Sequence, residues 1–209
     1  MKQSAIIYLK TILCALLLSV MTAEAQNYER MSEYEQNLYG ASAHVNGDYE
    51  TMKSIRAYWV KECNKLKSRN CEFVLCGTSE AVLKVTIPAR LLFVSGEATL
   101  SPQADAVLSP LLRFVSHDDA VASCIVSCHS DNNGSERYLS DFTKQRAYAV
   151  SSWMLKQGVN PNNVQYFGLG NKIYKTNNDN VKNRELNRRV TIYFVPNKKM
   201  LKMAKKGQL

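Results

Sequence analysis

Histidine, glycine and proline are scarce in this 209-residue sequence, which has 3 His, 9 Gly and 5 Pro. The low glycine and proline content excludes a collagen-like repeat, and 45% hydrophobic residues exclude disorder along the whole chain. His44, His117 and His129 show no metal-ligand spacing, so we expect neither a metal site nor a cofactor. One globular domain with some additional chain is the expectation for this length.

The sequence also lacks a hydrophobic run long enough to cross a bilayer, which takes about 20 residues. An apolar run covers residues 11–20, follows two lysines and precedes Ala23-Glu24-Ala25. A basic start, a short apolar core and an A-x-A step predict a secretory signal peptide over residues 1–25. An uncleaved membrane anchor and a lipid anchor on Cys14 are the alternatives, although Leu13 stands where a lipoprotein signal has a small residue.

Acidic residues are outnumbered by basic ones, 18 against 27, which gives a formal net charge of +9. Such a charge ordinarily indicates nucleic acid, an anionic membrane or another acidic polymer as the partner. A secreted protein has little access to nucleic acid, so we expect no nucleic-acid partner. The tail 198–209 is rich in lysine, and two interpretations of it stay open: a frayed, solvated end, or a peripheral contact with anionic lipid or acidic glycan.

The periodicity of apolar residues predicts an N-terminal extension, residues 26–70, with one helix, and a domain over residues 71–197. The domain is predicted to be an α+β two-layer sandwich with the order β-α-β-α-β-β and two helices packed on one face of the sheet. Ser101 is the expected N-cap of its first helix, with Pro102 at the first helical position and a break at Pro110. The predicted elements are a helix within 50–69, a hairpin of 71–76 and 81–87 around a turn at 77–80, a helix over 101–115, a strand at 122–127, a helix over 136–157, and strands at 164–167 and 190–195 separated by a long polar loop.

One residue of the second domain helix does not fit its surroundings. On a helical wheel, Arg146 falls inside an apolar arc that includes Leu139, Val150 and Trp153. An unpaired buried charge costs several kcal/mol, so the guanidinium needs a carboxylate partner or must open toward a cleft. The nearest acidic candidate is Asp131, at the end of the preceding strand. A structural ion pair and a binding site both stay open at this point.

Several short blocks, in order and at characteristic spacings, resemble the OmpA-like peptidoglycan-binding domain. The resemblance covers roughly residues 82–195, a little over half of the chain. It rests on Phe93, Gly96 and Leu100, the stretch from His129 to Ser135, Arg146-Ala147, Gly168-Leu169-Gly170, Asn178, Arg184 and Asn187-Arg188-Arg189-Val190.

The resemblance implies a non-catalytic module of the cell envelope, in the periplasm or associated with the outer membrane, whose partner is peptidoglycan. It implies that Asp131 and Arg146 hold the ammonium and carboxylate groups of the diaminopimelate in the stem peptide. Each contact is a charge-assisted hydrogen bond. Ser130, Asn132 and Arg188 complete the expected site, with backbone N–H groups of the loop at Asn132 as further donors.

Three further expectations concern the surroundings of this site. His129, Ser130 and Asp131 are residue types used in acyl transfer, but strand neighbours point to alternate faces, so we expect no enzyme. Of Arg188 and Arg189, one is expected to face the crevice and the other solvent. For the extension 26–70 two interpretations stay open: docking of an envelope protein partner in a structural or motor assembly, or capping of the domain.

Overall fold

The computed structural model describes residues 45, 47–66, 71–77, 79–116 and 120–209. These residues belong to one compact unit, 41–209. The predicted signal peptide and the first part of the extension lie outside the described residues. Within the described part of the chain, no helix has both the length and the apolar character needed to cross a membrane.

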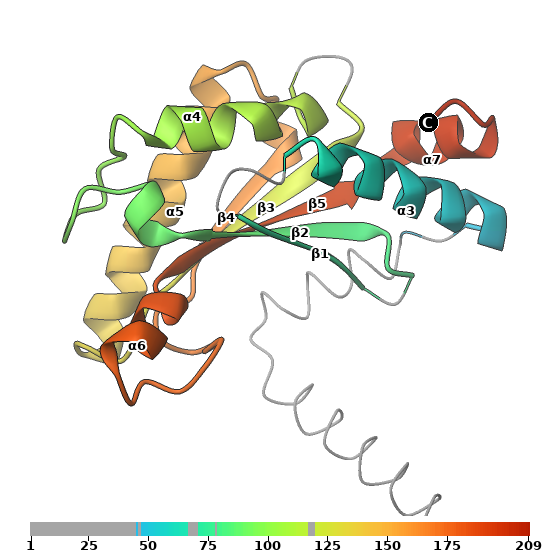
Figure 1. Cartoon of the computed structure of the whole chain (residues 1–209). Coiled ribbons are helices and arrows are strands. Elements are labelled where there is room, and N and C mark those ends of the chain that lie inside the picture. Colours follow the sequence, from blue (N-terminus) through green and yellow to red (C-terminus); the bar gives the residue numbers. More distant parts are fainter. Residues whose placement is uncertain (1–44, 46, 67–70, 78, 117–119) are drawn as a thin grey trace, which may run out of the picture. The chain divides into compact units, whose positions relative to one another are not determined.

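A five-stranded sheet with the order β1-β2-β5-β3-β4 forms one layer (Figure 1). β5 lies at its centre and is antiparallel to both β2 and β3, whereas β3 and β4 are parallel and are connected through α5. The predicted hairpin and the three later strands are confirmed. The strands are β1 (Glu72–Cys76), β2 (Val82–Pro88), β3 (Ala122–His129), β4 (Val164–Gly168) and β5 (Arg189–Pro196).

The two helices predicted for the first two thirds of the domain, over 101–115 and 136–157, are both present. α5 is N-capped by Ser135, whose side chain accepts a hydrogen bond from the Tyr138 backbone. Pro110 ends regular helix as predicted, because it has no N–H to donate, and the chain continues as a 3₁₀ helix. The elements are α3 (Tyr49–Asn64), η1 (Ala89–Leu91), α4 (Ala104–Leu108), η2 (Ser109–Phe114), α5 (Glu136–Lys156), η3 (Pro161–Asn163), α6 (Val181–Asn187) and α7 (Lys198–Lys205).

The predicted start of the first domain helix is wrong. α4 begins at Ala104, preceded by Gln103, and no side chain of the described residues caps it. Ser101 contributes its backbone instead, since its carbonyl accepts a hydrogen bond from the Ala104 N–H at 3.0 Å.

Two segments for which no helix was predicted are helical. The polar loop before β5 contains α6, which begins where the Asn180 side chain accepts a hydrogen bond from the Asn183 backbone. The tail is not a frayed end: Asn197 caps α7 in the same way, and Met200 and Ala204 are buried. Both starts use asparagine, whose side-chain oxygen replaces a missing backbone acceptor. Contact of the exposed lysines of α7 with anionic lipid or acidic glycan stays a prediction.

The helices pack on one face of the sheet, as predicted. Cys124 of β3 and Phe194 of β5 are paired in register on that face, and the Cys124 sulfur lies 3.9 Å from the sulfur of Met154 in α5. Phe114 of η2 meets Phe194 edge to face, with ring centroids 5.1 Å apart. Burial raises the pKa of the Cys124 thiol to about 12, so this cysteine is an inert part of the core.

α3 belongs to the same core, although it lies in the predicted extension. Its Trp59 is fully buried, contacts Phe114 edge to face at 5.1 Å, and donates a hydrogen bond to the Ala81 carbonyl at 2.7 Å. Glu62 of α3 forms an ion pair with Arg113 of η2 at 3.1 Å. The helix of the extension therefore caps the domain, and its apolar face is already occupied.

Glycine at the end of β4 is required by close approach to α5. A Cβ atom on Gly168 would lie 2.2 Å from the Lys144 backbone nitrogen and 2.4 Å from its Cα. The following Gly170 has φ +53°, and its carbonyl accepts a hydrogen bond from the Ser130 N–H at 2.7 Å. The Gly168-Leu169-Gly170 turn thus fixes both α5 and the segment that leads into Asp131.

We expect Gly168→Ala to lower the free energy of unfolding by about 3 kcal/mol, at the upper end of overpacking effects, because the clash is with helix backbone. Urea unfolding followed by circular dichroism measures the change. Gly207→Ala is the matched control: it has φ +65° but open space around its Cβ position, so only backbone strain of about 1–2 kcal/mol applies. Equal destabilisation of the two variants would contradict the packing argument.

Candidate functional site

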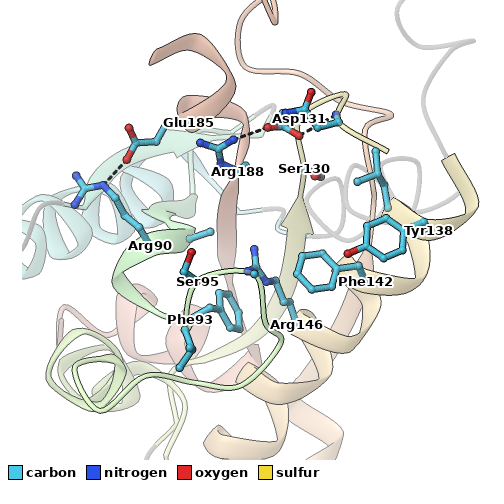
Figure 2. A pocket seen from close by; sticks show the side chains of 15 residues that line it. Arg90, Phe93, Ser95, Ser130, Asp131, Tyr138, Phe142, Arg146, Glu185 and Arg188 are labelled. Carbon is cyan, nitrogen blue, oxygen red and sulfur yellow. Dashed lines mark hydrogen bonds and ion pairs between the residues drawn. The ribbon is translucent and has the colours of Figure 1, made fainter. Parts of the chain in front are cut away.

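A cavity of about 570 Å³ opens at the end of β3. Its walls are η1 with the segment that follows, the loop after β3, one face of α5, and the chain at the end of α6 (Figure 2). Its labelled lining residues include three arginines and two carboxylates, together with Phe93, Tyr138 and Phe142. The sheet, two helices and an inter-element loop therefore converge on one opening.

Asp131 is held in a defined position at this opening. Its side chain is 4% exposed, and Oδ2 accepts a hydrogen bond from Arg188 Nη1 at 2.5 Å. Oδ1 accepts a hydrogen bond from the Asn133 N–H at 3.0 Å. Each carboxylate oxygen has two lone pairs, so both oxygens retain the capacity to accept a hydrogen bond from a ligand.

Arg146 reaches the same cavity from the middle of α5. Its Nε donates a hydrogen bond to the Glu97 carbonyl at 2.8 Å. The guanidinium lies between two rings, 4.3 Å from the centroid of Phe142 and 4.6 Å from that of Phe93. Stacked rings fix the plane of a guanidinium and contribute cation–π attraction. The two terminal nitrogens are thereby placed at the cavity with their plane defined.

The cavity contains one positive charge more than its carboxylates compensate. Arg188 forms an ion pair with Asp131, and Arg90 forms one with Glu185 at 2.7 Å. Among the described residues, no carboxylate forms an ion pair with Arg146. Of the two arrangements that the sequence left open for Arg146, a structural ion pair with Asp131 and an opening toward a cleft, the structure has the second, because Asp131 pairs with Arg188.

The environment of Arg146 makes this charge costly without a ligand. Burial is the main cause that lowers the pKa of the guanidinium, and the charge of Arg188 acts in the same direction. An arginine nonetheless stays protonated at neutral pH, because the pKa of a guanidinium lies far above neutrality. A half-desolvated cation of this kind favours an anionic group in the cavity.

Four of the five predicted site residues line the cavity: Ser130, Asp131, Arg146 and Arg188. Asn132 is exposed and is not among the lining residues, so its expected role is not supported by the geometry.

The loop at Asn132 also offers a ligand fewer backbone N–H donors than expected. Asn133 lines the cavity, but its N–H is used by Asp131.

The expectation for the two consecutive arginines is half wrong. Arg188 faces the cavity, but Arg189 is only 7% exposed and donates hydrogen bonds to the Ile173 carbonyl at 3.3 and 3.4 Å. It lies opposite His129 in the β3–β5 register. Burial, together with the charges of Arg189 and Lys84, holds the pKa of His129 well below its usual range, so this imidazole is neutral.

Five lining residues were not predicted to have a role in the site. Phe142 lies one helical turn before Arg146, a spacing that could have indicated a cation–π contact. Arg90 and Phe93 come from one segment and Glu185 from another, both far from Arg146 in the chain, and only the fold brings them to the cavity. Tyr138 stacks on Phe142 with centroids 5.7 Å apart and extends the aromatic wall.

The part of the chain that forms the cavity is similar to a known protein family. Residues 92–188 match the OmpA family. Outer membrane protein A of Klebsiella aerogenes is 31% identical over 102 residues, which are 47% of this chain and 29% of that protein. The Bordetella avium protein of the same name is 27% identical over 116 residues, 56% of this chain and 59% of that protein. The chain thus spans less than two thirds of the length of these relatives.

Solved structures show the same fold at low sequence identity. A putative MotB-like protein from Desulfovibrio vulgaris has a TM-score of 0.58 at 19% identity, covering 70% of this chain and 96% of that one. The cell wall anchor of the T6SS from Pseudomonas aeruginosa has a TM-score of 0.56 at 20% identity, covering 68% and 99% respectively.

Proposed function

The chain contains an OmpA-like domain, and from this premise we propose that it is a non-catalytic module that binds the peptidoglycan of the cell envelope. The observation that carries the proposal is Arg146, whose guanidinium lies between two aromatic rings at the cavity and forms no ion pair with a carboxylate of the described residues. The solved cell wall anchor from Pseudomonas aeruginosa, which has the same fold, supports it.

The finer proposal is that the ligand group is the diaminopimelate of the stem peptide. This residue carries an ammonium and a carboxylate on one carbon. The terminal nitrogens of Arg146 suit a forked pair of hydrogen bonds to the carboxylate, and Asp131 accepts from the ammonium. A cavity of about 570 Å³ is within the usual size range for small-molecule sites.

The other predicted site residues are not proposed to make the main contacts with the ligand. Arg188 holds Asp131 in position through its ion pair and adds positive charge to the cavity. Ser130 lines the wall and brings a hydroxyl to it. Asn132 lies on the exposed loop and has no assigned contact.

An enzymatic function is not supported by the arrangement of the three candidate catalytic residues. Ser130 and Asp131 line the cavity, whereas the His129 side chain is buried and does not. A nucleophile and its base must lie within hydrogen-bond reach of one another. We therefore propose binding alone, in the periplasm or at the outer membrane, to which the predicted signal peptide would direct the chain.

The test is sedimentation of the purified mature protein with isolated sacculi. We expect the protein to pellet with sacculi whose stem peptides contain diaminopimelate, and free meso-diaminopimelate to release it. Sacculi that contain lysine at the same position are the control, because lysine lacks the second carboxylate, and we expect little retention on them. Protein that stays in the supernatant with both polymers would refute peptidoglycan binding. Equal retention on both would refute the assignment to diaminopimelate alone.

A further inference from the structure

A second, smaller cavity of about 260 Å³ adjoins the first. Arg90 and Glu185 line both cavities, and their side chains form an ion pair at 2.7 Å on the wall that the cavities share. Figure 2 shows this pair at one side of the main cavity. Beyond the ion pair, the wall is built from the end of β2, from β1, from the start of β5, from α6 and from the loop before α6.

The lining of the second cavity has an excess of positive charge. Its cations are Arg90, Lys175, Lys182 and Arg189, against the carboxylates Glu72 and Glu185. Lys175 forms an ion pair with Glu72, and Arg90 forms one with Glu185. In the described part of the chain, no carboxylate forms an ion pair with Lys182, which is exposed on the first turn of α6. The cavity therefore favours an anionic group, and Lys182 is the side chain placed to meet it.

The barrier between the two cavities is weak. The Arg90 and Glu185 side chains are 61% and 44% exposed. An ion pair this exposed contributes little to stability, so a ligand can lie across it or displace it at little cost. One extended polymer can therefore occupy both cavities at once.

We infer that the second cavity is a subsite for a further carboxylate of the same peptidoglycan chain, bound while Arg146 holds the first. This inference rests on the proposed function and extends it from one residue of the ligand to a segment of it. Two linked sites bind more tightly than either alone, because the second contact is made within the complex already formed.

The experiment compares two probes by isothermal titration calorimetry on the mature chain. Free meso-diaminopimelate reaches the first cavity only, whereas a soluble disaccharide-tetrapeptide fragment is long enough for both. We expect Lys182→Glu to weaken binding of the fragment about tenfold, equivalent to one charge-assisted contact, and to leave binding of diaminopimelate within about twofold. Lys182→Ala is expected to act in the same direction with a smaller effect.

Lys156→Glu is the matched control, since this lysine is exposed at the end of α5 and lines neither cavity. An equal loss for Lys156→Glu and Lys182→Glu, or a Lys182→Glu loss that is the same for both probes, would overturn the subsite. So would an unchanged affinity for the fragment. The proposed function fails separately, if the unmodified protein binds neither probe.

Discussion

Arg146→Ala is expected to abolish retention on sacculi that contain diaminopimelate, with a fall in affinity of about 100-fold or more. Hydrogen bonds between charged groups contribute about 1.5–3 kcal/mol each, and the forked contact supplies two. Each 1.4 kcal/mol is a factor of ten in affinity. Arg146→Lys is expected to lose most of this binding, because an ammonium keeps the charge but makes neither the forked contact nor the same stacking on Phe93 and Phe142. Sedimentation and calorimetry with the muropeptide fragment measure both variants.

The interpretation requires that the Arg146 variants fold. Arg146 contributes a hydrogen bond from Nε to the Glu97 carbonyl and cation–π contacts with two rings, but burial of its charge costs desolvation, so the net change in stability is expected to be small. Circular dichroism and the melting temperature check this. Arg137→Ala, on the exposed side of the same helix, is the control and should bind normally. Undiminished binding by folded Arg146→Ala protein would show that the cavity does not hold the ligand carboxylate.

The part of the fold that was predictable depends on local patterns. The α5 helix has a capping serine and an apolar stripe, and Gly158 follows its end, so its bounds were predicted to within one residue. α6 and α7 were missed because their sequences are polar or basic. A capping asparagine is the one local signal of where each helix starts. α7 is stable because Met200 and Ala204 pack into the fold, which is information from tertiary structure.

In the candidate site, too, local patterns were predictable and tertiary contacts were not. Arg146 was identified from sequence because a charge in an apolar stripe is a local anomaly. Its partners were not, because Phe93 lies more than fifty residues earlier and the choice of Arg188 over Arg146 as the partner of Asp131 depends on where β5 enters the sheet. A residue type can indicate that a charge needs a partner, but only the strand order decides which partner it meets.

Asp131→Ala is expected to abolish retention as completely as Arg146→Ala, for a different reason. The change removes the acceptor for the ligand ammonium and also leaves Arg188 without its carboxylate. The cavity then holds two uncompensated guanidinium groups in place of one. A zwitterionic ligand loses affinity, because its ammonium group now faces net positive charge, whereas a simple dicarboxylate gains affinity.

A pair of small probes separates this explanation from loss of folding. Pimelate has the carbon chain of diaminopimelate and both carboxylates but no ammonium groups. We expect the unmodified protein to bind diaminopimelate more tightly, and Asp131→Ala and Asp131→Asn to reverse the order. Asp141→Asn, on the exposed side of α5, removes a carboxylate without touching the cavity and should keep the original order. If the Asp131 variants lose affinity for both probes alike, the carboxylate shapes the cavity and does not select the ammonium, because only selection by charge predicts a reversal.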